Sequence, residues 1–189
     1  MKIYLTKKEV LEKFNLLEGA ELVIEGLEDE TVDSGEFYEV DFPEMTAKEI
    51  YEQSDNKLGN GKLLYDIDRY KNEDFFLKEK TRPGKRLVLK NVIGVGKDWN
   101  ECQALVKEKG GEMLNFAEVL YVIWKYPGFL ENMYTWTSSR SSVGFLVNVG
   151  EADAGGASVD GWEPDLSDSD LGVVFLRSLD NLQFKFLKI

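Results

Sequence analysis

The chain has 189 residues, and its 23 Lys and Arg against 35 Asp and Glu give a formal net charge of −12. A chain this acidic repels phosphate backbones and anionic membrane surfaces, which argues against nucleic-acid and membrane partners. It contains no histidine and one cysteine, Cys102. Serine-histidine and cysteine-histidine nucleophile systems are therefore excluded, and we expect a protein that is not an enzyme.

A single cysteine cannot form a disulfide within the chain, which favours a reducing, cytoplasmic compartment. The first eight residues lack the apolar stretch of a secretory signal. No run approaches the roughly 18 apolar residues that a membrane helix needs, so we expect no membrane insertion. Export or association with a virion stays open, because a leader can be removed before the protein matures.

Capping boxes, in which a polar cap precedes a Glu by three residues, predict four helix starts. These boxes are Thr6/Glu9, Thr46/Glu49, Asp98/Glu101 and Asn115/Glu118. The first opens a short helix with Val10, Leu11 and Phe14 on one face, and a strand is expected at residues 21–24. The acidic residues 25–44 predict mostly loop, with room for one short strand.

The second helix, residues 47–53, ends in a run of breaker residues at 54–61. Farther on, Pro83-Gly84 marks a turn, and residues 86–90 are a predicted strand. We place a domain boundary at this turn. It separates an N-terminal α/β accessory region, residues 1–85, from a ligand-binding domain, residues 86–189.

Residues 98–109 and 115–126 are predicted helices, each with an apolar stripe at helical spacing. The residues of the two stripes are Cys102, Leu105, Val106, Phe116, Val119, Leu120 and Ile123. Short apolar runs then alternate with segments rich in Gly, Ser, Asp and Ala, and the predicted strands are residues 134–137, 145–149 and 172–177. This pattern predicts a scaffold of strands that carries long polar loops.

The run from Trp99 through Cys102 and Val106 to Gly110-Gly111 resembles the first helix of C-type lectin domains. In that family a small residue stands at the Cys102 position and a disulfide cysteine at the Val106 position. Residues 134–137 resemble the lectin strand after the second helix, and residues 172–177 resemble the closing strand. The resemblance implies an α+β, C-type-lectin-like fold with two helices, small twisted antiparallel sheets and long loops.

Both lectin disulfides are absent, and so are the calcium-and-sugar motifs, to which Glu163-Pro164-Asp165 is the nearest approach. Disulfide-free versions of this fold include formylglycine-generating-enzyme-like domains and the variable proteins of diversity-generating retroelements. The enzyme needs a cysteine pair near the end of the domain, which this chain lacks. Residues 135–140 and 171–178 resemble the fixed strands that bracket the hypervariable segment of the variable proteins.

Between these brackets, residues 141–170 are dominated by Ser, Gly, Asp and Ala and contain no lysine. The resemblance implies variation at Asn codons, which can become these residues but not lysine. An ordinary set of polar loops explains the same composition. The alternative is therefore a structural or assembly protein, such as a phage-tail component or a fixed-partner adaptor, with the same fold and constant loops.

The resemblance implies a binding surface for a protein ligand, with no cofactor. The residues expected to form it are Arg140, Ser141, Ser142, Gly144, Phe145, Asn148, Glu151, Asp153, Gly155, Ser158, Asp160, Trp162, Glu163, Asp165, Ser167, Asp168 and Asp170. Seven carboxylates and no cation lie between residues 141 and 176, which suits a cationic surface on the ligand. A solvated loop that keeps the protein soluble is the plain alternative.

Phe145 and Trp162 are large apolar residues among these polar segments, and either can anchor an interface or fill the core. For Trp162 we favour the surface, whereas the other three tryptophans, Trp99, Trp124 and Trp136, are expected in the core. The carboxylates from Asp165 to Asp170 lack the spacing of a calcium-binding loop, so we expect no metal site. We expect a packed thiol at Cys102 and a monomeric protein.

Overall fold

The computed structural model describes residues 36–59, 61–153 and 155–178, which fall within one compact unit, Val32–Leu182. The helix expected after Thr6 and the strand expected at residues 21–24 lie outside the described residues. The described part is a mixed α+β structure with small sheets, none of them closed. Within it, no helix is both long enough and apolar enough to span a bilayer.

The first sheet has the strand order β1-β4-β10-β5, and all its strand pairs are antiparallel. Its strands are β1 (Phe37–Phe42), β4 (Gly84–Leu89), β10 (Phe175–Ser178) and β5 (Glu112–Met113). Phe37 pairs with Leu89 and Phe42 with Gly84, so β1 lies beside β4 along its whole length. Residues on both sides of the boundary placed at 85/86 therefore share one sheet. The turn at Pro83-Gly84 interrupts the chain locally but does not separate two domains. The sequence near the turn does not reveal that β1, before it, pairs with β4, after it.

The second sheet has the order β8-β7-β6-β9. Its strands are β6 (Tyr134–Arg140), β7 (Leu146–Asp153), β8 (Gly156–Trp162) and β9 (Leu171–Gly172). The first three are antiparallel neighbours, and β9 runs parallel to β6. A small hairpin, β2 (Lys57–Leu58) with β3 (Gly61–Lys62), makes a third sheet.

Three helices begin at the predicted capping boxes: α2 (Ala47–Ser54), α4 (Trp99–Glu108) and α5 (Phe116–Lys125). In each box the cap side chain accepts a hydrogen bond from the backbone N–H of the Glu, whose carboxylate accepts one from the cap backbone. Both unpaired donors at the helix start are thereby satisfied, which explains why the bounds match the prediction to within two residues. The short helix α3 (Asp74–Leu77) and a 3₁₀ turn (Ile67–Arg69) were not predicted.

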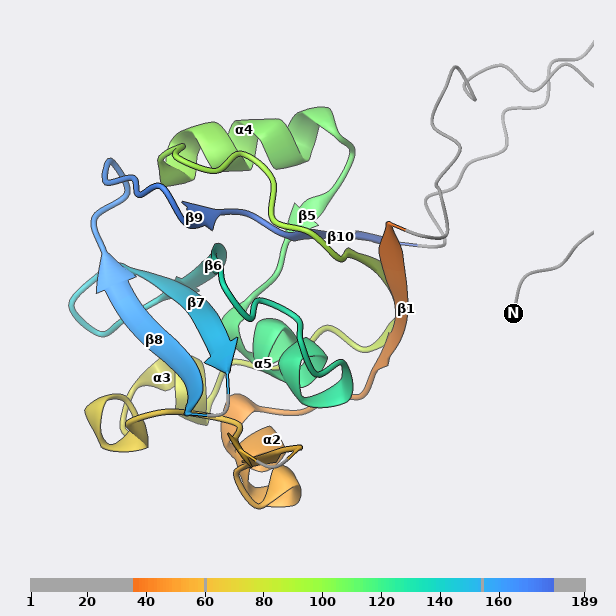
Figure 1. Cartoon of the computed structure of the whole chain (residues 1–189), viewed down its shortest axis with the longest axis vertical. Coiled ribbons are helices and arrows are strands. Elements are labelled where there is room, and N and C mark those ends of the chain that lie inside the picture. The colour runs from red at the N-terminus through yellow and green to blue at the C-terminus, as the bar shows by residue number, and fades with distance from the viewer. Residues whose placement is uncertain (1–35, 60, 154, 179–189) are drawn as a thin grey trace, which may run out of the picture. The chain divides into compact units, whose positions relative to one another are not determined.

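Helix α5 lies at the centre of the described structure, between the two four-stranded sheets, with α2 and α3 packed against it (Figure 1). Its stripe residues Phe116, Val119, Leu120 and Ile123 are all completely buried. Helix α4 lies on the other side of β9 and β10, above a second apolar cluster that contains Cys102, Val106 and Trp136. The stripe prediction is confirmed except at Leu105, which is half-buried.

Residues 141–170 differ most from the prediction, because they are mainly a hairpin and not a set of long loops. Strand β7 extends to Asp153, and β8 returns beside it from Gly156 to Trp162. Strand β8 has the two-residue alternation of a half-buried strand, with Ala157 and Val159 buried and Ser158 and Asp160 partly exposed. The sequence signal was weak because only these two small apolar residues lie inward.

Candidate functional site

The β6-β7-β8 sheet has two different faces. Val147, Val149 and Val159 point toward α5 and belong to its core cluster. Because side chains alternate along a strand, the intervening residues point to the opposite side, and cross-strand pairing places Asn148 beside Trp136 and Asp160. We call this side the outer face. Its side chains are those of Tyr134, Trp136, Leu146, Asn148, Ser158, Asp160 and Trp162, of which Trp136 and Leu146 belong to the apolar cluster beneath α4.

The aromatic part of the outer face consists of two tryptophans in edge-to-face contact. Trp136 is completely buried, as expected, and its indole N–H donates a hydrogen bond to the Lys97 carbonyl at 3.4 Å. Trp162 packs edge-on against it, with 6.4 Å between ring centroids and 79° between the planes. Trp162 is partly exposed and packs against the apolar cluster beneath α4. Trp99 and Trp124 are also only partly buried, which corrects their expected core positions.

A polar cluster lies next to the tryptophans. The Tyr134 hydroxyl donates a hydrogen bond to Glu151 Oε2 at 2.7 Å. A Cβ at Gly150 would lie 2.6 Å from Tyr134 Cγ, so the missing side chain is what lets the tyrosine ring lie across the strand. Burial raises the pKa of Tyr134 to about 12, and the carboxylates of Glu151 and Asp160 act in the same direction. Tyr134 is therefore a neutral, oriented phenol at physiological pH.

Asn148 is only 2% exposed, although it was expected to be displayed on the surface. Its position in the middle of a central strand, between Trp136 and Asp160, accounts for the burial. Its Nδ2 is buried and has no hydrogen-bond partner among the described residues. A buried donor without a partner costs about 1–3 kcal/mol, and native proteins contain few of them. The amide of Asn148 is therefore a buried donor for which the described residues supply no acceptor.

Four of the seven carboxylates have partners among the described residues; Asp153 and Asp168 accept hydrogen bonds from the nearby Gly155 N–H and from Ser169. Asp160 Oδ1 lies 3.5 Å from Arg69 Nη2, and Glu151 accepts the Tyr134 hydrogen bond. The Arg69 pair is solvent-exposed, so it contributes little stability. Four of the seven are well exposed, namely Asp153, Glu163, Asp165 and Asp168, and Asp170 is partly buried. Among the described residues, no three acidic or cysteine side chains are grouped so that they could hold a metal ion.

The turn before β7 is attached to the segment around α3. The backbone N–H and the hydroxyl of Ser142 donate hydrogen bonds to Glu73, at 2.6 and 2.9 Å. Arg140 donates to the Gly144 carbonyl at 2.9 Å. Val143 and Phe145 in this turn are 76% and 40% exposed, which resolves the position of Phe145 in favour of the surface. Ser141 is partly buried, while Gly144, Gly155 and Ser167 are exposed and Ser158 is partly exposed.

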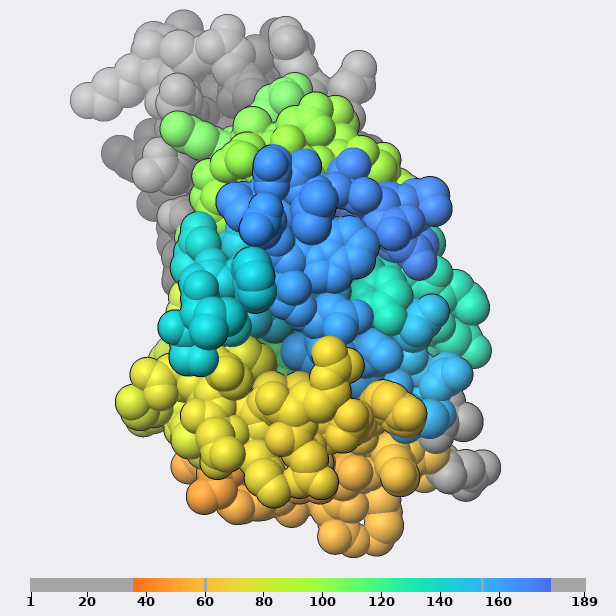
Figure 2. Space-filling model, turned by 90° about the vertical axis from the view of Figure 1, so that its left-hand side faces the viewer, coloured from red at the N-terminus to blue at the C-terminus, as the bar shows by residue number. Residues whose placement is uncertain are grey.

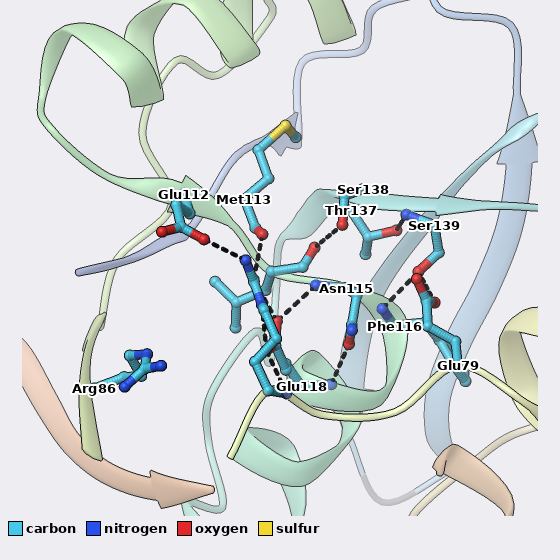
Figure 3. Close-up of polar contacts among 12 residues, drawn as sticks. Glu79, Arg86, Glu112, Met113, Asn115, Phe116, Glu118, Thr137, Ser138 and Ser139 are labelled. Atoms are coloured by element: carbon cyan, nitrogen blue, oxygen red, sulfur yellow. Dashed lines mark hydrogen bonds and ion pairs between the residues drawn. The ribbon is translucent and has the colours of Figure 1, made fainter. Parts of the chain in front are cut away.

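A second polar cluster lies at the start of α5 (Figure 3). Arg82 binds Glu118 there, and Ser139 accepts a hydrogen bond from the Phe116 N–H while donating one to Glu79. Ser139 is buried, so its hydroxyl is not accessible to a substrate. This cluster joins residues 79–82 and the end of β6 to the helix start, and no short-range sequence signal pointed to it.

Cys102 is completely buried, which confirms the expected packed thiol. Burial raises its pKa to about 11, and the neighbouring carboxylates of Asp98 and Glu101 act in the same direction. A thiol with so high a pKa carries almost no thiolate at neutral pH, so it is a poor nucleophile.

The outer face thus combines a partly exposed indole, a neutral phenol, a buried amide without a partner among the described residues, and a surrounding excess of carboxylates. In comparisons with known proteins, no family model, no curated protein and no solved structure matches this chain.

Proposed function

We propose that this chain is a ligand-binding protein with a C-type-lectin-like fold, and that it binds a protein ligand through the outer face and its flanking turns. We further propose that a retroelement diversifies residues 141–170. The observation that carries the proposal is the unpartnered Nδ2 of Asn148, a buried donor at the centre of a face with half-exposed aromatic side chains. A ligand carbonyl or carboxylate that displaced the side chains covering this amide would remove the cost of the unsatisfied donor.

The order of elements supports the lectin-like part of the proposal. Strand β4 is followed by the two capped helices α4 and α5, then by the three antiparallel strands β6, β7 and β8. The closing strand β10 then returns to pair with β4. A first strand, two helices, a small antiparallel sheet and a closing strand are the elements that the resemblance implies.

The ligand chemistry follows from the side chains around Asn148. Trp162 and Phe145 are partly exposed aromatic residues, which bury much area at a small cost in side-chain entropy. The exposed carboxylates of Glu163, Asp165 and Asp168 follow directly after β8. A ligand with an apolar anchor and a cationic rim fits this combination.

The hairpin also suits a diversified surface. Outward residues of β8, such as Ser158 and Asp160, can change without altering the packing around α5, whereas inward residues, such as Ala157 and Val159, cannot. The core can therefore tolerate many different surfaces on the same hairpin.

Deep sequencing of the 3′ end of this gene across a natural population tests the proposal. We expect substitutions at alternate positions of β8, namely 158, 160 and 162, and in the turns at 141–145 and 163–170. The inward positions 147, 149, 157 and 159 are internal controls and should stay constant. If residues 141–170 are as invariant as the helices, the diversified binder is rejected in favour of a fixed-partner structural or assembly protein.

A further inference from the structure

The outer edge of β8 is only partly covered. The Ala157 N–H donates to the Leu63 carbonyl at 3.1 Å, and its carbonyl accepts from the Tyr65 N–H at 3.0 Å. The peptide groups of Ala157 therefore point away from β7. Backbone groups repeat every second residue, so the N–H and C=O of Val159 and Gly161 point to the same free side.

The hydrogen bonds on the other side of β7 agree with this orientation. The Val147 carbonyl accepts from Thr137 Oγ1 at 2.7 Å, which places the peptide groups of Val147 toward β6. The cross-strand partner of Val147 is Gly161. Val147 and Gly161 are therefore a non-hydrogen-bonded pair, and the backbone N–H and C=O of Gly161 point away from β7. Among the described residues, no strand continues along the edge past Ala157, since the chain turns into the 3₁₀ helix at Ile67–Arg69.

A cleft opens beside this uncovered edge. Its volume is about 120 Å³, and the inward side chains of Val147, Val159 and Phe75 contribute its apolar lining. Gly161, which also lines it, has no side chain to fill it. The space corresponds to roughly four water volumes, enough for one aliphatic side chain. Figure 2 views the molecule from the side on which β8 lies, with β8 in blue above the yellow segment that contains α3.

The charges around the edge are mainly negative. Asp160 and Glu73 line the cleft, and Glu163 follows β8 directly. The cation in the lining is Arg69, which pairs with Asp160, so the remaining charge comes from Glu73 and Glu163. A second copy of this chain, with its own net charge of −12, would be repelled. A segment that carries lysine or arginine beside an apolar residue would be attracted.

We propose that the edge of β8 at Val159–Asp160–Gly161 receives an extended basic segment of a partner protein as an additional strand. The segment bonds to the backbone of Val159 and Gly161 and inserts one apolar side chain into the cleft. An exposed edge is a template for strand addition, in which backbone bonds supply affinity and a side-chain pocket supplies specificity. This site adjoins the outer face and shares Asp160 with it, but its apolar lining, Val147 and Val159, lies on the side of the sheet that faces α5.

The test uses the full chain and a synthetic octapeptide of alternating lysine and valine with blocked ends. Amide hydrogen exchange followed by NMR should show Val159 and Gly161 exchanging faster than Ser158 and Asp160 in the free protein. Peptide addition should slow both edge amides about tenfold or more. A peptide that is N-methylated on every second residue should bind in one methylation register and fail in the other.

Gly161→Pro removes the outward N–H, and Gly161→Ala is its matched control. Both variants introduce a Cβ, which in ideal geometry lies 3.2 Å from Phe145 Cβ, but only alanine keeps the N–H. Proline is tolerated at an outward-facing edge position. We expect the proline variant to bind the peptide about tenfold more weakly than the alanine variant. Equal affinity of the two variants, equal binding of both N-methylated peptides, or no binding at millimolar concentration would overturn the proposal. Shifts at Asn148 and Trp162 in place of Val159 and Gly161 would also overturn it and would place the peptide on the outer face.

Discussion

Arg82 forms a bidentate ion pair with the carboxylate of Glu118, in which Nε donates to Oε1 at 2.8 Å and Nη2 donates to Oε2 at 2.7 Å. Its backbone N–H also donates to Oε1, at 3.0 Å. The Glu118 side chain is completely buried, and the same carboxylate accepts a hydrogen bond from the Asn115 N–H. One carboxylate therefore completes the start of α5 and holds the segment that leads into β4.

Arg82→Met should destabilise the protein by about 3–5 kcal/mol, because it leaves the Glu118 carboxylate buried without its cation. Arg82→Lys keeps the charge but not the two-point geometry and should cost less. Urea unfolding of both variants measures the difference. A loss below about 1 kcal/mol for Arg82→Met would mean that solvent reaches Glu118 and that the pair is not structural.

Glu79 should make stability fall as pH rises. Burial raises the pKa of this carboxyl above its ordinary value of 4.5, so the folded state binds a proton that the unfolded state has already released. Stability is then lost from about pH 4.5 up through the raised pKa. Glu79→Gln removes this loss, so it should be more stable than the wild type at pH 7 and should match it more closely at pH 4. Urea titrations across this range measure the difference, and a difference independent of pH would contradict the assignment.

Asn148→Leu should raise the free energy of unfolding by about 1 kcal/mol, because a leucine of similar size carries no unsatisfied donor. The same change should abolish ligand binding at the outer face. A gain in stability together with a loss of binding is expected if Asn148 serves ligand recognition and not folding. Asn148→Asp is the contrasting variant, and it should be strongly destabilising because it buries an unpaired charge. If Asn148→Leu destabilises the fold, the amide has a structural role and the proposed function loses its main support.

Gly156→Ala should cost about 3 kcal/mol or more. The backbone φ of Gly156 is +105°, and an added Cβ would lie 2.6 Å from backbone atoms of Leu64 and Tyr65. The neighbouring variant Gly155→Ala, at an exposed position where the nearest atom is the flexible Asp153 carboxylate, should change stability far less. Thermal unfolding of the pair tests whether the β7-β8 turn is as closely packed as these distances indicate.

Features that depend on a few adjacent residues could be predicted from the sequence. The capping boxes at Thr46, Asp98 and Asn115 set helix starts within four residues, and the predicted helices agree with the structure. Strand β8 was not predicted, because its identity depends on pairing with β7 more than on its own apolar content.

The same distinction applies to the candidate site. Its location on residues 141–170 was what the resemblance implied and the local composition agreed with, but the Arg69–Asp160 pair joins positions far apart in the chain. The burial of Asn148 and the position of Tyr134 over Gly150 likewise depend on how the strands pair. A single sequence contains no short-range signal for such contacts.

The arrangement of β1 and β10 has a mechanical consequence. Both strands are antiparallel to β4 and flank it, so they run in the same direction on either side of it. Tension applied before Phe37 and after Ser178 would pull β1 and β10 in opposite directions along the strand axis. The hydrogen bonds lie across that axis and would be loaded together in shear, not broken one after another. The described unit should therefore resist stretching between its two chain ends more strongly than its thermodynamic stability alone would suggest.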